Sequence, residues 1–225
     1  MKIIALVPIK EHSERIPGKN FRPFHGHPLY YHILNTLEMT DLVSQTLVNT
    51  DSLMLLDELP EQFSKVKTVL RPEAIRGGLV SMNQIIAHDL AISDGDVYFQ
   101  THVTNPLIRV KTVTNALETF LAQQGSYDSL LSVTRHQCRF YRQDGSPLMH
   151  DPVNLQRTQD LEPLFEENSH FFIFTKESFA STHSRLGKSP YLYETPKIES
   201  VDIDEEESFE MAEIIAKQLS LVPVG

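Results

Sequence analysis

The amino-acid sequence predicts a doubly wound α/β fold, in which helices cover both faces of a mostly parallel sheet. Short apolar runs of strand length alternate with segments whose apolar residues recur at helical spacing. The alternation begins with the run at 3–7, which is apolar enough for a strand buried on both faces, and continues to about residue 133. Polar segments follow several of these runs, as expected where the strands of an open sheet present ligand-binding loops.

Composition and length limit the classes to which the protein can belong. The chain has 225 residues, so we expect a single domain over 1–225 with a sizeable core. Its hydrophobic fraction of 40% fits a soluble globular protein, and no apolar run approaches the ~20 residues of a membrane span. The single cysteine, Cys138, excludes an intrachain disulfide, and the first apolar run is too short for a signal peptide. We therefore expect a cytoplasmic protein without a membrane partner.

The formal net charge of −10 argues against a broad basic surface for duplex nucleic acid, so we expect no nucleic-acid partner. An acidic protein that binds a triphosphate needs a local cluster of cations or a metal ion to overcome its own field. The sequence offers one candidate for each of these elements, at opposite ends of the chain.

The elements after the first strand follow in a regular order. Pro28 suits the first turn of the first helix, whose apolar residues lie at helical spacing. Further strands are expected at 45–49, 66–70, 96–100 and 129–133, and further helices at 53–59, 82–92 and 110–121. Ser52 and Ser81 are candidate N-caps for two of these helices.

A basic loop joins the first strand to the first helix. Lys10 follows the strand directly, and Lys19 follows a Pro-Gly turn that can fold the chain back. With Ser13 and backbone N–H groups, the two lysines could cradle an anion such as a phosphate. The residues of the loop are equally compatible with an ordinary solvated connection between a strand and a helix.

Between Arg135 and Pro163 the chain is polar and irregular, with a hairpin-type turn at Asp144-Gly145. Such an excursion indicates a subdomain, a lid or a subunit contact. We treat 135–170 as an inserted subdomain for dimerisation and substrate binding. An apolar strand is expected at 171–174, directly after it.

The segment 198–213 contains eight acidic residues and no basic residue. If Ser200 to Ile203 is a strand, Asp202 and Asp204 point to the same side and form an oxygen site suited to Mg²⁺. The glutamates at 205–207 fit the first turn of a terminal helix, where the helix dipole favours negative charge. The buried face of that helix is expected to hold Phe209, Ala212, Ile215, Ala216 and Leu219.

The first loop resembles the opening signature of the cytidylyltransferases that activate sialic acid and related acid sugars. Their pattern is Arg-x-x-Ser-x-x-Ile/Leu-Pro-x-Lys-Asn followed by Gly-x-Pro-Leu, and residues 10–20 and 26–29 keep this spacing. Lys10 stands where the family usually has arginine. A lysine can hold a phosphate as a point charge but lacks the bidentate fork of arginine.

Further segments resemble the family in the expected order: Thr50-Asp51, Arg71-Pro72 with the loop to Ser81, the loop 101–107, the segment 157–163, and Asp202-Ile203-Asp204 before the last helix. Two more positions depart from the family pattern. Gly78 stands where relatives commonly carry aspartate, and Glu166 stands where they carry arginine.

The resemblance implies a Rossmann-like nucleotidyltransferase, a homodimer that uses Mg²⁺ to transfer CMP from CTP to an acid sugar and releases pyrophosphate. The implied catalytic residues are Lys10, Lys19 and Asp204. The implied nucleotide contacts are Pro8, Lys10, Ser13, Lys19, Asn20, Asp51, Arg71 and Ser81. The implied substrate contacts are His102, Thr104, Asn105, Arg157, Gln159 and Asn168. Asp202 and Asp204 would hold the metal.

Three alternatives remain open on the sequence. A nucleotide-sugar glycosyltransferase also uses an Asp-x-Asp metal site, although it normally lies mid-chain. The same fold could act on a different acid or phosphonate, a reading favoured by Lys10, Gly78 and Glu166. A nucleotide-binding protein without turnover is the third.

No residue is an obvious general base for the implied transfer reaction; a metal-bound water or Asp204 could serve.

Overall fold

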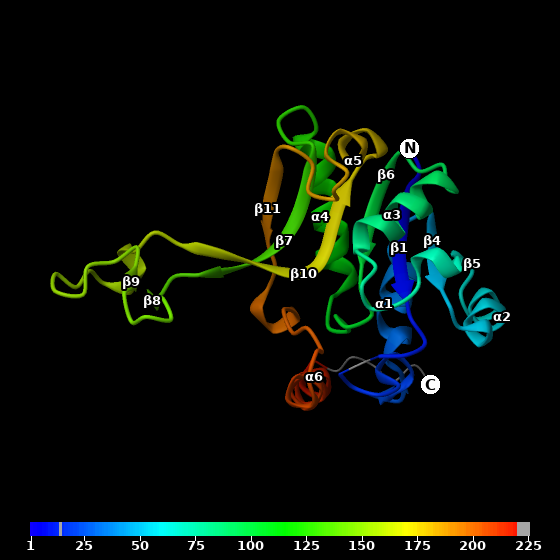
Figure 1. Ribbon diagram of the computed structural model, residues 1–225, viewed down its shortest axis with the longest axis horizontal. Helices are drawn as coiled ribbons and strands as arrows, with labels where there is room; N and C mark the ends of the chain where they lie inside the picture. Colours follow the sequence, from blue (N-terminus) through cyan, green and yellow to red (C-terminus); the bar gives the residue numbers. More distant parts are fainter. Residues whose placement is uncertain (14, 220–225) are drawn as a thin grey trace.

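The computed structural model describes residues 1–13 and 15–219, and its centre is a seven-stranded sheet (Figure 1). The strand order is β11-β7-β10-β6-β1-β4-β5. The strands are β1 Ile3–Ile9, β4 Gln45–Thr50, β5 Val66–Leu70, β6 Val97–Thr101, β7 Ser129–His136, β10 Leu164–Phe174 and β11 Pro190–Glu194. Strand β10 is antiparallel to β6 and β7, whereas the other pairings are parallel, so the sheet is mostly parallel as predicted.

Helices cover both faces of this sheet, which confirms the doubly wound architecture. The helices are α1 Leu29–Glu38, α2 Leu53–Gln62, α3 Met82–Ala91, α4 Val110–Gln123, α5 Lys176–Thr182 and α6 Glu206–Gln218. Alternate residues of β1 point into different cores: Ala5 packs with α1, α2 and α4, while Leu6 packs with α3 and α5. Because both faces are covered, β1 reads as a continuous apolar run.

A third apolar cluster joins the two ends of the chain. Phe209, Ala212 and Ala216 of α6 pack against Phe24 and Leu29 at the start of the chain. The short pieces β2 (Pro23–Phe24), β3 (His27–Pro28) and η1 (Lys19–Phe21) lie in the same region. This packing holds the C-terminal acidic segment beside the loop that follows β1.

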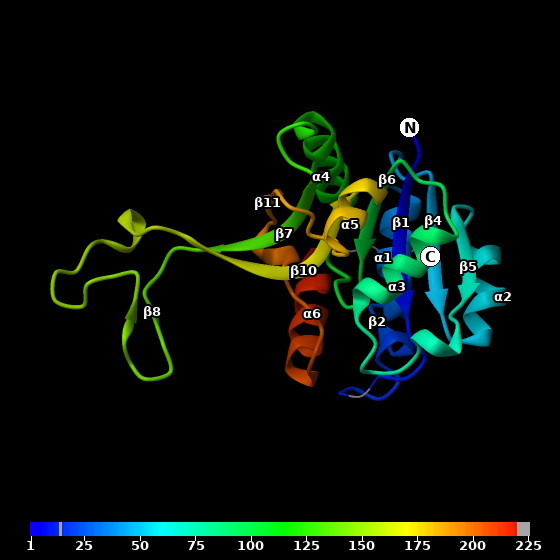
Figure 2. The ribbon, with the colours of Figure 1, turned by 45° about the horizontal axis from the view of Figure 1, so that its top comes forward.

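The excursion between β7 and β10 forms an arm that extends away from the sheet in both ribbon views (Figures 1 and 2). The turn predicted at Asp144-Gly145 joins the paired strands β8 (Phe140–Tyr141) and β9 (Pro147–Leu148). The short helix η3 (Thr158–Asp160) follows before β10 begins. Large apolar side chains are exposed on the arm: Tyr141, Met149, Val153 and Leu155.

Two features differ from the sequence prediction. Strand β11 was not predicted, because it lies at the edge of the sheet and its alternation of half-buried and exposed residues is weak. The strand expected at Ser200 to Ile203 does not form. They directly follow the short helix η4 (Lys197–Glu199), and no strand of the described chain pairs with them. Another short helix, η2 (Glu73–Ile75), lies between β5 and α3. Within 1–13 and 15–219, no helix combines the length and the apolar character needed to cross a membrane.

Candidate active site

A cleft of about 480 Å³ opens at the carboxyl ends of the parallel strands. Lys10 follows β1 and His102 follows its neighbour β6, while Arg71 follows β5 on the far side of β4, so three strand ends on the same edge of the sheet each deliver a polar side chain. The cleft brings together most of the predicted site residues: Pro8, Lys10, Ser13, Lys19, Asn20, Arg71, His102, Thr104, Asp202 and Asp204. It is therefore the candidate active site.

The first loop folds back as the Pro-Gly turn predicts. Gly18 has a φ of 66°, a left-handed conformation that favours glycine, and the N–H of Lys19 donates to the carbonyl of Ile16. The Asn20 amide donates to the carbonyl of Lys10 at 2.8 Å. This bond ties the two lysine-bearing parts of the loop together, so that both lysines line one cleft.

Lys19 connects the loop to the C-terminal segment. Its side chain is buried, and its ammonium donates to the carbonyl of Ile203 and lies 3.4 Å from Oδ1 of Asp204. Burial lowers the pKa of Lys19, while Asp204 opposes that shift. Arg15 adds a second cation 3.0 Å from Asp204. The two ends of the chain therefore meet across a single cleft.

The carboxylates of Asp202 and Asp204 share this cleft although their segment is not a strand. The N–H of Ile203 donates to the carbonyl of Thr104 at 2.9 Å, and its side chain is fully buried, so both neighbours turn toward the cleft. Burial raises the pKa of Asp202, and the nearby charge of Asp204 raises it further. Two close carboxylates of this kind are stabilised by a cation.

Asp202 offers one direct test of the fit for Mg²⁺. Its Oδ1 is buried and has no hydrogen-bond partner in the described part of the chain. Among these residues, no group of three or more histidine, cysteine or acidic side chains is placed so that it could hold a metal ion. Mg²⁺ is usually held by one or two carboxylates plus phosphate oxygens and water, so a pair of aspartates fits this ion.

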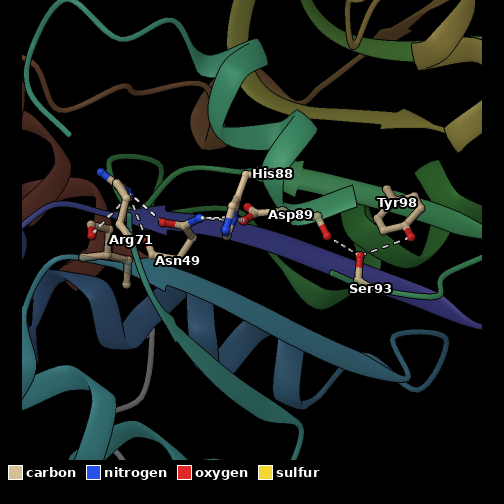
Figure 3. A network of polar contacts seen from close by, with 7 residues as sticks. Asn49, Arg71, His88, Asp89, Ser93 and Tyr98 are labelled. Atoms are coloured by element: carbon tan, nitrogen blue, oxygen red, sulfur yellow. Dashed lines mark hydrogen bonds and ion pairs between the residues drawn. The ribbon is translucent and has the colours of Figure 1, made fainter. Parts of the chain in front are cut away.

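Arg71 is buried beside the cleft and is held by polar contacts to its own sheet (Figure 3). Its Nε donates to Oδ1 of Asn49 at 2.8 Å, and its Nη2 donates to the backbone carbonyl of Asn49 at 2.7 Å. Burial lowers the pKa of Arg71. The guanidinium is thus fixed on its inner side before any ligand is present.

His102 is held by Gln100 and Arg185, a grouping that the sequence did not predict. Nη1 of Arg185 donates to Oε1 of Gln100 at 2.6 Å, which fixes the orientation of the Gln100 amide. Nε2 of Gln100 lies 3.0 Å from Nε2 of His102, and Nη1 of Arg185 lies 3.5 Å from the same atom. Because both neighbours are donors, Nε2 of His102 accepts and Nδ1 carries the hydrogen. Burial and Arg185 lower the pKa of His102 to about 3, so it stays neutral.

Replacing His102 by glutamine is expected to reduce the fall in melting temperature that occurs as the pH is lowered. The pKa of this imidazole is about 3 in the fold against an ordinary 6.5, so between these values the unfolded state binds a proton that the folded state does not. The wild-type chain therefore loses stability as the pH falls from about 7 to about 4, and H102Q loses less. Melting temperatures across this range test the prediction. Equal losses in both chains would contradict it, and H12Q at an exposed histidine is the control.

Three predicted nucleotide or substrate residues lie close to the cleft without lining it. Asp51 accepts the N–H of Glu11 at 2.8 Å and supports the first loop. Ser81 is the N-cap of α3, as predicted, and its N–H donates to the Gln84 side chain. Asn105 is buried, and neither of its side-chain polar atoms has a partner within the described residues. In this placement they support the walls of the cleft.

The structure does not bring Arg157, Gln159 and Asn168 to the cleft of their own chain. Arg157 is exposed and pairs with Asp160 at 2.7 Å, next to the arm residue Gln159. Asn168 is buried and donates to the hydroxyls of Thr134 in β7 and of Thr195, which directly follows β11. Only its neighbour Ser169 lines the cleft. Within one chain these three side chains therefore lie away from the cleft, because the arm carries the first two away and Asn168 points into the sheet.

Arg185 is the main residue that sequence reasoning missed. Its guanidinium lies 3.5 Å from the ring centre of Phe172 and 3.7 Å from the carboxylate of Glu167. Burial lowers its pKa to about 10. No spacing in the sequence marks it, because it stands in an irregular segment after α5 and acts through Gln100 and His102.

Comparison with known proteins decides the family. A profile of the family described as cytidylyltransferase matches residues 4–223. This chain belongs to the cytidylyltransferase family. N-acylneuraminate cytidylyltransferase of Streptococcus agalactiae serotype V is 24% identical over 221 residues, covering 93% of this chain and 52% of the relative.

Two shorter relatives match the chain along nearly their whole length. CMP-N,N'-diacetyllegionaminic acid synthase of Legionella pneumophila is 24% identical, covering 91% of each chain. Pseudaminic acid cytidylyltransferase of Campylobacter jejuni is 21% identical, covering 96% of this chain and 97% of the relative. The chain spans about half the length of the Streptococcus relative.

Solved structures share the fold of this chain. CMP:2-keto-3-deoxy-manno-octonic acid synthetase complexed with CTP superimposes with a TM-score of 0.68 at 15% identity, covering 97% of this chain and 100% of that one. A 4-diphosphocytidyl-2C-methyl-D-erythritol synthase from Anaerococcus prevotii gives 0.68 at 9% identity, with 96% of each chain covered. The predicted Rossmann-like nucleotidyltransferase fold is confirmed.

Proposed function

We propose that this chain transfers CMP from CTP to an acid sugar of the sialic acid or 2-keto-3-deoxy acid type, with Mg²⁺, and releases pyrophosphate. The observation that carries the proposal is the cleft itself, which Lys10, Lys19 and Arg71 line together with the carboxylates of Asp202 and Asp204. Cations suit a triphosphate, and a carboxylate pair suits a divalent ion. The relatives named as CMP-sugar synthases and cytidylyltransferases of acid sugars support the choice of substrates.

The reaction asks for positioning and charge neutralisation more than for covalent chemistry. A hydroxyl of the acceptor, the anomeric one in an acid sugar, forms a bond to the α-phosphorus. The bond between the α-phosphorus and the bridging oxygen breaks, and pyrophosphate leaves with the electron pair. Lys10 and Lys19 hold the triphosphate and offset the charge that moves onto pyrophosphate. Mg²⁺ held by Asp202 and Asp204 would supply Lewis-acid polarisation of the phosphate oxygens.

The acceptor proton needs an oxygen that can take it. Asp204 borders the cleft and is partly exposed, in contact with Arg15 and Lys19. It is the candidate base within the chain. His102, neutral with its hydrogen on Nδ1, can donate a hydrogen bond to the acceptor.

A second copy of the chain would complete the acceptor site, and we propose a homodimer in which the arm lies against the partner. The arm exposes apolar side chains, Val153 among them at 85%, and it carries Arg157 away from its own cleft. An exposed apolar patch of this kind marks an interaction site. Sedimentation of the wild type and of V153D with L155D tests this: a monomeric wild type would contradict the dimer.

Pyrophosphate release measured with CTP, ATP, GTP and UTP against a panel of acid sugars tests the proposed function. We expect release with CTP and at least one acid sugar, dependent on both and on Mg²⁺. Release from CTP also separates this activity from a glycosyltransferase, which would consume a preformed nucleotide sugar. CTP binding without release across the panel would favour a nucleotide-binding protein without turnover.

A further inference from the structure

Arg71 enters the cleft at the end of a buried chain of side chains from three elements (Figure 3). Arg71 follows β5, Asn49 belongs to β4 and Asp89 belongs to α3. The amide of Asn49 joins the other two: its Oδ1 accepts from Nε of Arg71 at 2.8 Å, and its Nδ2 donates to Oδ1 of Asp89 at 2.6 Å. His88 closes the chain, with Nδ1 3.2 Å from the same oxygen of Asp89.

The contacts settle the orientation of each group. An asparagine amide can turn by half a rotation and exchange its oxygen for its nitrogen. With Asp89 as an acceptor on one side and Arg71 as a donor on the other, only the observed orientation makes both hydrogen bonds. Nε and Nη2 of Arg71 are then used on the inner side, toward Asn49 and the carbonyl of Ile9. Figure 3 shows the remaining nitrogen of the guanidinium pointing away from Asn49.

Asp89 is a buried acidic residue that is expected to destabilise the fold. It is 1% exposed, and its Oδ2 has no hydrogen-bond partner in the described ranges. A buried carboxylate with incomplete hydrogen bonding destabilises a fold, and an apolar side chain of similar size would often stabilise it. A role that an apolar side chain could not fill explains its presence here.

We propose that Asp89 is a positioning residue, which acts through Asn49 to direct the outer edge of the Arg71 guanidinium at the bound nucleotide. The inference rests on the proposed function, because it assigns the nucleotide as the ligand of Arg71. Asp89 does not line the cleft. Its effect on binding therefore passes through Arg71.

A double-mutant cycle between Asp89 and Arg71 tests the proposal, with CTP affinity measured by calorimetry in the presence of Mg²⁺. We expect D89A to weaken CTP binding about tenfold, the effect of losing one well-made charged hydrogen bond. R71A weakens it by at least as much. The double variant binds no more weakly than R71A alone, because Asp89 has nothing left to orient. D89N, which keeps an oxygen acceptor for Asn49, restores affinity to within about threefold of wild type.

Steady-state kinetics give a readout that a general loss of structure would not. D89A raises the KM for CTP and leaves kcat and the KM for the acceptor unchanged. The matched control is S93A, because the Ser93 hydroxyl donates to the backbone carbonyl of Asp89 but lies outside the chain to Arg71. S93A keeps the wild-type affinity for CTP. If D89A does not fold, D89L removes the same acceptor while filling its space.

The outcomes separate the inference from the proposed function. If wild type and R71A both fail to bind CTP, the proposed function is wrong and the inference falls with it. If R71A weakens binding but D89A and D89L do not, the inference alone is wrong. Additive losses in the double variant also overturn it, because they would mean that Asp89 acts independently of Arg71.

Discussion

Replacing Lys19 by methionine lowers CTP-dependent pyrophosphate release by about 100- to 1,000-fold, the expected effect of removing one preorganised charge donor from an active site. Lys19 is buried beside Asp204 and lines the cleft. Methionine keeps most of the apolar stem and removes the cation. The loss appears mainly in kcat, because charge moves onto pyrophosphate as the bond to the α-phosphorus breaks.

The same substitution also removes the donor to the carbonyl of Ile203. An unsatisfied buried carbonyl costs about 1–3 kcal/mol, so a fall in melting temperature is expected alongside the loss of activity. Urea unfolding of the variant separates the two effects. Turnover is then measured without urea, where the variant is folded. If K19M keeps the wild-type turnover under these conditions, Lys19 has no part in the reaction.

Arg22 provides a matched control for Lys19. It follows the same loop, pairs with Glu206 at 2.7 Å and lies 3.9 Å from the ring centre of Phe209, so it also holds the C-terminal segment. It does not line the cleft. R22M is expected to lose stability while keeping the wild-type rate. Equal losses of rate in R22M and K19M would mean that both act only by holding the segment in place.

The fold was predictable because its strongest signals are local. Strand β1 is buried on both faces, and this burial accounts for the apolar run at 3–7 that predicted it, although the strand itself continues past Pro8 to Ile9. The turn at Gly18 and the cap at Ser81 also depend on residues close in sequence. Strand β11 lies at the edge of the sheet, where exposure removes the hydrophobic pattern, so the sequence carried little sign of it.

The site was predictable only in part, for a similar reason. Lys10 and His102 follow predicted strands, and strand ends meet at one edge of a parallel sheet. The arm extends away from the sheet (Figure 1), and this direction is set by tertiary structure, so nothing local to Arg157 shows that it lies away from its own cleft. Arg185 reaches His102 through Gln100 from a distant segment, a contact with no sequence period.

Asp202 and Asp204 were paired for a reason that the structure does not support. The expected strand would have placed the two side chains on one side by alternation. The segment is irregular instead, and the pairing results from burial of Ile203 between them and from its bonds to Thr104 and Lys19. The residues were located correctly, while the geometry that locates them was not.

Asp202→Asn is expected to have opposite effects on stability and on activity. Burial raises the pKa of the Asp202 carboxyl and Asp204 adds repulsion, so the charged form is disfavoured in the fold. An amide of the same shape removes that cost. In EDTA at neutral pH the melting temperature of D202N therefore rises, by roughly 2–4 °C if the gain is about 1 kcal/mol. Pyrophosphate release falls at least about 100-fold, because the metal loses one of its two carboxylates.

The response of the melting temperature to Mg²⁺ distinguishes a metal ligand from a buried carboxylate that only destabilises the fold. A ligand that binds only the folded state raises its melting temperature, so Mg²⁺ with CTP stabilises the wild type more than D202N. The control is E206Q, which changes an exposed carboxylate of the same segment that pairs with Arg22 outside the cleft. E206Q should keep the full response to Mg²⁺. If D202N also keeps that response together with turnover, the ion does not bind Asp202. If D202N is less stable than wild type in EDTA, the carboxylate contributes to folding, and its unpartnered oxygen no longer points to a cation.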